Sequence, residues 1–272
     1  MEPESRFADA QGDADKPGGS ALARGVSILQ AFTIERPTMT TRELMVATGL
    51  PKPTLFRLAT TLCEAGLLRY EESDGRFMPA PGLARLAAPL LARISIRQLA
   101  FGPMQALAER LCAQVSLALG LGLDLVFIEL AQSRDCVTVR PAMGSHISLS
   151  RTASGRAYLA ALPPQQLEQY MEEVRTKSPA GADVLAERMQ ETRRDLAERG
   201  FCVSHGDLHR QLEAVAVPLR ATGRHDEIYV FACTVPSFEL KPGQLFEDIG
   251  PRLATLARSI EAGLGAPPTM GA

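Results

Sequence analysis

Residues 40–66 contain two short helical patterns separated by a tight turn, and this segment constrains the fold more than any other. Thr40 followed three residues later by Glu43 has the spacing of a capping box, which opens a short helix. The sequence T-G-L-P at 48–51 breaks that helix, and a second helix is expected from about 52–54 to 65, just before a glycine. Two helices joined by a tight turn are therefore predicted.

The segments on either side complete a larger motif. An amphipathic helix is expected from about Leu22 to Phe32, because its apolar residues recur at spacings of three and four. After the second helix, residues 67–71 and 76–78 flank the polar turn 72–75, which predicts a β-hairpin. Three helices followed by a hairpin, in this order, predict a winged helix-turn-helix.

Such a motif places the N-terminal turn of its second helix in the DNA major groove. Lys52 can donate to guanine O6 or N7, and Thr54 can contact bases or phosphate. The candidate DNA-binding residues are Thr41, Arg42, Lys52, Pro53, Thr54, Phe56, Arg57, Arg69 and Arg76. The arginines of the second helix and the wing suit phosphate contacts, which supply most of the affinity and its salt dependence. The alternative is a helical hairpin in an ordinary core, carrying solvated cations.

The charge distribution agrees with DNA binding by the N-terminal part. The whole chain has a formal net charge of −2, but residues 21–93 carry nine basic against six acidic side chains, a net of +3. Residues 1–20 are acidic, poor in apolar residues and rich in glycine, which predicts a disordered tail. The excess of positive charge is modest, and it lies in the segment that would contact DNA.

From residue 83 onward the pattern predicts a connecting helix and then a second, mixed domain. With 272 residues the chain suits two domains, and we expect boundaries at 1–20 (tail), 21–82 (winged helix-turn-helix), 83–100 (linker helix), 101–264 (second domain) and 265–272 (flexible tail). Helices are expected at 83 into the 90s, 96–112, 154–162, 165–174, 184–198 and 245–262. Strands are expected at 115–121, 125–131, 136–140, 201–204, 214–218 and 228–234.

Signals for export and for membrane insertion are absent from the sequence. The acidic N-terminus has no apolar signal-peptide core, and no stretch reaches ~18 uninterrupted apolar residues, so a cytoplasmic protein without membrane contact is expected. No C-x-x-C pair occurs. Buried, reduced thiols are expected for all five cysteines, Cys63, Cys112, Cys136, Cys202 and Cys233.

Three patterns bear on an enzyme as an alternative. His205, Asp207 and His209 alternate, and on a strand they would share one face and could hold Zn or Fe. The glycine among them and the position at a loop edge favour solvated polar residues instead. The glycines at 120–122 lack a third glycine and a following helix, and Ser154-Gly155 lacks the G-x-S-x-G elbow. We therefore expect no enzyme, no metal and no cofactor.

Motifs in both domains resemble the IclR-type transcription regulators, over about residues 22–262. In the first domain they are A-R-G-V-S-I-L-Q-A-F (23–32), T-T-R-E-L (40–44) and G-L-P-K-P-T-L-F-R-L (49–58). In the second they are G-S-H-I-S-L-S-R-T-A-S-G-R-A-Y-L-A (144–160), E-R-G-F-C-V-S-H-G-D (198–207) and A-V-A-V-P-L (214–219). The recognition helix departs from the family pattern at Pro53, where Ser or Ala is more usual.

The resemblance implies an α+β fold in two domains, with a GAF-like antiparallel sheet and flanking helices following the winged helix. It implies that the second domain binds a small, often carboxylate-bearing effector. By position, the effector contacts are Met143, Ala153, Ser154, Gly155, Ser204, Ala214, Ala232 and Thr234. Relatives often have an acid, a cysteine and two serines at the last four positions, so a less polar pocket and a bulkier, more aromatic effector are expected here.

A negatively charged effector would also need positive partners. The helix that begins near Ser154 offers backbone N–H groups and a favourable dipole. Arg140 and Arg151 are candidate counter-charges, or otherwise surface arginines. The sequence thus predicts a regulator that binds double-stranded operator DNA as a dimer or a dimer of dimers and responds to a carboxylic acid of a catabolic pathway. The alternatives are a ligand-free oligomerisation domain, or a metabolic enzyme with a winged helix as an interaction module.

Overall fold

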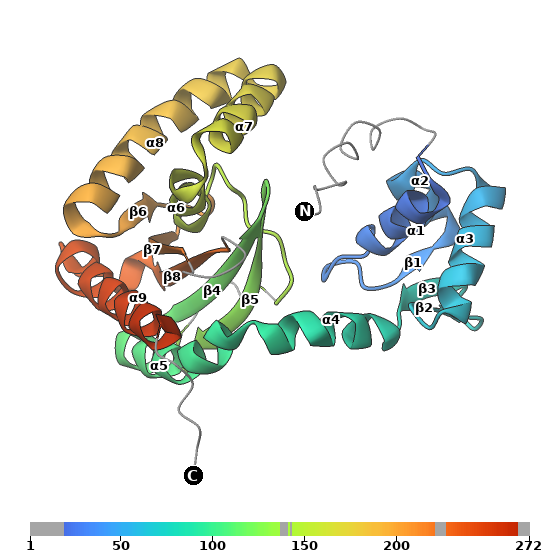
Figure 1. Ribbon diagram of the computed structural model, residues 1–272, viewed down its shortest axis with the longest axis horizontal. Helices are drawn as coiled ribbons and strands as arrows, with labels where there is room; N and C mark the ends of the chain where they lie inside the picture. The colour runs from blue at the N-terminus through green and yellow to red at the C-terminus, as the bar shows by residue number, and fades with distance from the viewer. Residues whose placement is uncertain (1–18, 137–140, 142, 221–226, 266–272) are drawn as a thin grey trace, which may run out of the picture. The chain divides into compact units, whose positions relative to one another are not determined.

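The computed structural model describes residues 19–136, 141, 143–220 and 227–265 (Figure 1). The described chain divides into two compact units, the first ending at Arg93 and the second beginning at Ile94. Each unit has a hydrophobic core of its own. Among the described residues, no helix combines the length and the apolar character that crossing a bilayer requires.

The first unit confirms the expected order of helices and hairpin. Its elements are α1 (Ala21–Gln30), β1 (Met39–Thr40), α2 (Thr41–Thr48), α3 (Lys52–Glu64), β2 (Leu68–Glu71), β3 (Arg76–Pro79) and α4 (Gly82–Arg93). The short strand β1 was not expected from the sequence. It pairs with β3, so that the wing is a three-stranded antiparallel sheet in the order β1-β3-β2.

Local sequence explains the helix ends of this unit. The capping box is confirmed: the Thr40 hydroxyl accepts the N–H of Glu43 at 3.3 Å, and the Glu43 carboxylate accepts the N–H of Thr40 at 2.6 Å. Gly49 follows α2 in the left-handed conformation, with φ of 68°, which glycine adopts without steric cost. The helices and the wing bury a shared core that includes Ile28, Leu55 and Phe77.

The second unit is built on one five-stranded antiparallel sheet. Its elements are α5 (Ser95–Leu111), β4 (Gln114–Leu121), β5 (Asp124–Gln132), α6 (Ala153–Ala161), α7 (Pro164–Lys177), α8 (Pro179–Arg199), β6 (Cys202–His205), β7 (Leu212–Arg220), β8 (Ile228–Pro236), a 3₁₀ turn (Ser237–Glu239), a π-helical turn (Leu245–Ile249) and α9 (Gly250–Gly265). The strand order is β5-β4-β8-β7-β6. This confirms an α+β fold with an antiparallel sheet and flanking helices.

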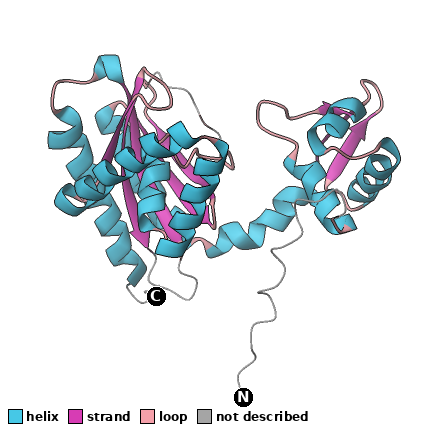
Figure 2. Cartoon of the chain, turned by 90° about the horizontal axis from the view of Figure 1, so that it is seen from above, coloured by secondary structure: helices cyan, strands magenta, loops and turns pink. Residues whose placement is uncertain are grey.

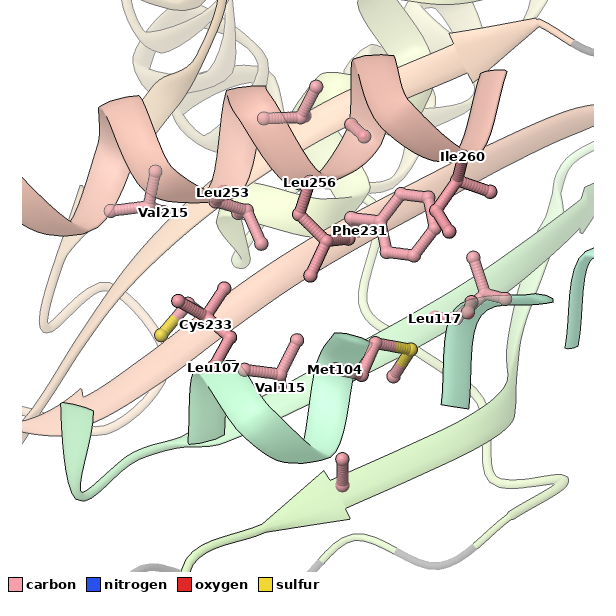
Figure 3. Close-up of a cluster of buried hydrophobic side chains, with 14 of the residues drawn as sticks. Met104, Leu107, Val115, Leu117, Val215, Phe231, Cys233, Leu253, Leu256 and Ile260 are labelled. Atoms are coloured by element: carbon pink, nitrogen blue, oxygen red, sulfur yellow. The ribbon is translucent and has the colours of Figure 1, made fainter. Parts of the chain in front are cut away.

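Helices cover both faces of this sheet (Figures 1 and 2). On one face α5 and α9 pack on alternate strand residues, and their cluster includes Met104, Leu107, Leu253 and Phe231 (Figure 3). On the other face lies α6, with α7 and α8 packed beyond it. Because successive strand residues point to opposite faces, the strand side chains under α6 are different from those that pack against α5 and α9.

Some element boundaries differ from expectation. α8 begins at Pro179 rather than near residue 184, because the Ser178 hydroxyl caps it and proline is favourable in the first helical turn. The segment expected as one helix from 245 begins as a π-helical turn before α9. Cys136 lies outside any strand, and residues 137–140 of the expected strand lie outside the described residues.

The cysteines only partly match the expectation of buried thiols. Cys136, Cys202 and Cys233 are buried, and burial raises the pKa of the Cys202 and Cys233 thiols to about 12. Cys63 is half-buried. For Cys112 the expectation is wrong, because its side chain is exposed at the end of α5. Apolar neighbours in the sequence did not reveal that the chain turns outward at this helix end.

Cys112 is also the one described residue other than glycine with a positive φ, at 47°. A β-carbon in the left-handed region costs about 1 kcal/mol, which glycine avoids. We therefore expect Cys112→Gly to raise the free energy of unfolding by about 0.5–1 kcal/mol. Chemical denaturation measures this, and Cys112→Ala is the control that removes the thiol but keeps the strain. An equal gain from both variants would attribute the effect to the thiol instead.

Candidate DNA interface and effector site

The N-terminus of α3 has no side-chain cap. Pro51 precedes the helix and no side chain caps it, so its first backbone N–H groups are left for an external partner. Leu55 and Ala59 are fully buried and fix the helix on the core. This anchoring directs the opposite face of α3 to solvent.

α3 carries five of the nine predicted DNA-binding residues, and four of these five are exposed. Lys52, Pro53, Phe56 and Arg57 are exposed, whereas Thr54 is half-buried. The pairs 52/56 and 53/57 are each four residues apart and so lie one above the other on the helix surface. Phe56 is 53% exposed, which is unusual for a large aromatic side chain and suits contact with a thymine methyl group.

In the wing, the two predicted arginines have different surroundings. Arg69 has a side chain 64% exposed, near Glu71 at 3.8 Å. Arg76 instead binds inward: its Nε donates to the Thr38 hydroxyl at 2.9 Å, and its Nη2 pairs with Glu43 at 3.1 Å. Arg69 is therefore available to a phosphate, whereas Arg76 primarily joins the wing to α2.

Glu43 takes part both in the ion pair with Arg76 and in the capping box of α2. The Thr40 backbone N–H, then the Thr40 hydroxyl and Arg76, hold the pKa of the Glu43 carboxyl below its ordinary value. Thr41 and Arg42, the two predicted contacts on α2, begin the same helix, with Arg42 exposed and Thr41 half-buried. Capping box, turn, recognition helix and wing thus form one continuous framework under the exposed face of α3.

The second candidate site is the sheet face under α6. Directly paired residues on neighbouring strands share a face, and Ser204 pairs with Ala214, which pairs with Thr234. In the next row Ala216 pairs with Ala232. The structure thus brings the four predicted strand residues onto one floor of small side chains, here called the effector floor: Ser204, Ala214, Ala216, Ala232 and Thr234.

The start of α6 lies above this floor. The carbonyl oxygen of Ala153 is 3.6 Å from the Sγ of Cys202, which neighbours the floor on β6. Thr152 caps the helix by accepting the N–H of Gly155 at 2.9 Å, and the N–H groups of Ala153 and Ser154 precede the first helical hydrogen bond. All three predicted residues at this helix start are buried.

Gly155 sits where no other residue fits. A β-carbon at this position would lie 2.3 Å from the carbonyl oxygen of Ser148 and 2.4 Å from the Cα of Leu149. The glycine thus allows the loop 148–149 to run against the first turn of α6. This close approach fixes the height of the helix start above the sheet.

Two polar residues of the floor were missed from the sequence. Gln114 pairs with Thr234 and Ser116 with Ala232, so both lie on the same face, and each is 5% exposed. The sequence pattern that could have indicated them is the alternation Q-V-S-L at 114–117, in which the two polar residues take the β4 positions that face the floor. The floor is therefore more polar than expected.

The remaining predicted effector residues lie elsewhere. Met143 is 54% exposed in a turn whose next residue, Gly144, donates its N–H to Phe127 of β5. Arg151 is exposed, and its Nη2 lies 3.5 Å from the carbonyl oxygen of Leu208. Arg140 lies outside the described residues.

The residues of the metal alternative serve other partners. His205 pairs with Glu213 at 2.6 Å, and Asp207 pairs with the buried Arg156 at 2.9 Å. Burial acts to raise the pKa of Asp207, but the Ser204 hydroxyl and two arginines outweigh it and hold that pKa below its ordinary value. In the described part of the chain, no three metal-binding side chains gather into a group.

Comparison with known proteins identifies both domains of the chain. The model of the IclR helix-turn-helix domain matches residues 21–72, and the model of the bacterial transcriptional regulator IclR C-terminal domain matches residues 88–260. The transcriptional regulator TsaQ1/TsaQ2 of Comamonas testosteroni is 28% identical over 244 residues, covering 89% of this chain and 87% of that protein.

Solved structures of similar proteins agree with these family matches. An IclR family transcriptional regulator from Brucella abortus is 34% identical, with a TM-score of 0.80 and coverage of 92% of this chain and 93% of that one. An IclR homolog from Microbacterium hydrocarbonoxydans, complexed with 4-hydroxybenzoate, has the same fold at 21% identity and a TM-score of 0.70, covering 90% of this chain and 100% of that one.

The winged helix-turn-helix, with its exposed third helix, and the sheet domain that follows it in the sequence define a DNA-binding transcription regulator. The chain belongs to the IclR family of transcriptional regulators. The matching proteins are regulators and not enzymes, which decides against the alternative of a metabolic enzyme.

Proposed function

We propose that this regulator binds a palindromic operator as a symmetric dimer and that an aromatic carboxylic acid on the effector floor changes its affinity for that operator. Residues 21–82 would contact DNA, 83–100 would connect the domains and 101–264 would hold the effector. Two-fold symmetry places one recognition helix in each half-site, which a single winged helix binds too weakly alone. Dimers that pair into tetramers would serve the same purpose.

The observation that carries the choice of effector is the composition of the floor. Three of its residues are alanines: Ala216 and Ala232 are buried under α6, whereas Ala214, beside Thr234, is half-buried, so a flat ring would lie against small side chains there. The hydroxyls of Ser204 and Thr234 can hydrogen-bond ring substituents. The N–H groups at the start of α6 suit a carboxylate. The 4-hydroxybenzoate bound by the Microbacterium homolog is an acid of this kind.

Thermal denaturation with 4-hydroxybenzoate and related acids tests this proposal. A ligand that binds the folded protein at about 100 times its Kd adds about 2.7 kcal/mol, which for a domain of this size raises the Tm by roughly 5–10 °C. Ala214→Leu places a larger side chain on the floor and should abolish the shift. Ala197→Leu makes the same change on the exposed side of α8 and should preserve it.

Operator binding measured with the same acids completes the test. The coupling between the two sites is expected to change operator affinity by about 1–3 kcal/mol, or roughly 5- to 150-fold. If Ala214→Leu and the unmodified protein respond alike to every acid, the effector floor is not the site. If no acid changes the Tm at all, the second domain is better explained as a ligand-free oligomerisation domain.

A further inference from the structure

A cavity of the second unit lies at the edge of the sheet, beyond β6. It has a volume of about 310 Å³, near the lower end of the range for small-molecule sites. Its walls come from α8, from Val203 and His205 of β6, from Arg156 of α6 and from Phe246 of the π-helical turn. None of the predicted effector residues lines it, so it is distinct from the effector floor.

Arg156 is the most unusual wall residue. It is 2% exposed, and its two terminal nitrogens are engaged: Nη2 binds Asp207 and the carbonyl oxygen of Val203, and Nη1 lies 3.4 Å from the carbonyl oxygen of Ser150. Its Nε, however, is buried without a hydrogen-bond partner among the described residues. Buried N–H donors are nearly always paired in proteins, and an unpaired one on a residue that lines a cavity indicates a missing acceptor.

The other charged groups leave the wall positive. Four arginines contribute to it, Arg156, Arg188, Arg194 and Arg199, against the two acids Glu191 and Asp195. Asp207 binds Arg156 and Arg188 from one side, and His205 is paired with Glu213. Arg188 also pairs with Glu191, and Arg199 with Asp195. Among the described residues Arg194 has no acidic partner, so guanidinium groups still outnumber carboxylates by one.

An aromatic ring completes the cavity. The guanidinium of Arg199 lies over the ring of Phe246, with its Cζ 4.9 Å from the ring centroid. Stacking of this kind holds an arginine in place while its N–H groups stay directed outward. Arginine forks match the oxygens of carboxylates and phosphates.

We propose that this cavity is a second ligand site, specific for a small oxyanion, that is, a carboxylate or phosphate group carried by a metabolite. The oxyanion accepts the N–H of Arg156 Nε, neutralises the one excess positive charge, that of Arg194, and lies beside the guanidinium of Arg199. Ser204 of the effector floor donates its hydroxyl to the same Asp207 that binds Arg156. The two sites therefore share one carboxylate, through which occupancy of one affects the other.

Calorimetric titration of the full chain with inorganic phosphate, and separately with acetate, in a chloride buffer tests the proposal. Saturable binding is expected, and Arg194→Ala/Arg199→Ala should weaken it by about tenfold or more, since both changes remove charge-assisted partners. The matched control, Arg175→Ala/Arg193→Ala, removes two exposed helix arginines outside the cavity and should leave the affinity within about twofold. Binding of phosphate alone assigns a phosphate-bearing ligand, and binding of acetate alone or of both assigns the carboxylate or the shared oxyanion chemistry.

The outcomes separate this site from the effector floor. Ala214→Leu should leave phosphate and acetate binding unchanged, whatever it does to aromatic acids. The proposal is overturned if neither probe binds saturably, if the cavity variant binds like the unmodified protein, or if Ala214→Leu abolishes binding that the cavity variant retains. Circular dichroism of each variant shows whether the fold is intact, and the exposed positions of Arg194 and Arg199 make that the expected result.

Discussion

Lys52→Ala/Arg57→Ala is expected to lose specific operator binding. Lys52 lies in the exposed first turn of α3, where a contact to a base edge is worth about 1–3 kcal/mol, and a dimer makes that contact twice. The affinity for the operator should therefore fall by about a hundredfold or more. Loss of the Arg57 phosphate contacts should also reduce the salt dependence of binding, by about one counter-ion for each contact removed. Fluorescence anisotropy on fragments of the upstream region, at two salt concentrations, measures both effects.

The matched control is Arg175→Ala/Lys177→Ala on α7. It removes the same number of positive charges from exposed helix positions in the second unit. If net charge alone governed DNA binding, both variants would lose affinity equally. An unchanged affinity in both would show that the exposed face of α3 does not contact DNA.

Gly155→Ala is expected to destabilise the second unit strongly. In an ordinary helix this substitution would be favourable by up to about 1 kcal/mol, because alanine is the better helix former. Here the new methyl group would meet the backbone of residues 148 and 149 at 2.3–2.5 Å, and backbone atoms have little freedom to move aside. Overpacking costs about 3 kcal/mol, so the net loss should be about 2 kcal/mol or more. A fall in Tm of roughly 4–8 °C follows for a domain of this size.

Gly102→Ala in α5 is expected to change the stability in the opposite direction. That glycine is exposed and a β-carbon on it would meet nothing within 4 Å, so only the gain in helix propensity remains. The variant should be more stable by about 0.5–1 kcal/mol. Destabilisation by both glycine variants, or by neither, would contradict the clash described at Gly155.

Most of the first unit could be predicted from its sequence, because its signals are local. The Thr40–Glu43 capping box, the glycine that ends α2 and the hairpin turn each act within a few residues. Strand β1 could not be predicted in this way, because two residues carry no periodicity and Met39 is ordered by pairing with Phe77. The contacts of Arg76 with Thr38 and Glu43 could not be predicted for a related reason, because both partners lie more than thirty residues away in the sequence.

The effector floor was predicted in part. Its strand residues were placed by resemblance to a family pattern, and antiparallel register brings them together. Gln114 and Ser116 were missed because membership of the floor depends on which strand pairs with β8, and local sequence does not determine that. The cavity behind β6 could not be foreseen either, since Arg156 and Phe246 are ninety residues apart and meet only through the fold.

Glu43 takes part in two interactions, capping α2 and binding the wing through Arg76. The orientation of the wing relative to the helix-turn-helix is thereby set by residues that do not belong to the exposed face of α3. Under the proposed function, substitutions at Lys52, Pro53, Phe56 or Arg57 should therefore alter base preference while the underlying framework stays the same. For protein engineering this makes the domain a scaffold, in which operator preference can be redesigned by changing one helix face, with no compensating change in the wing.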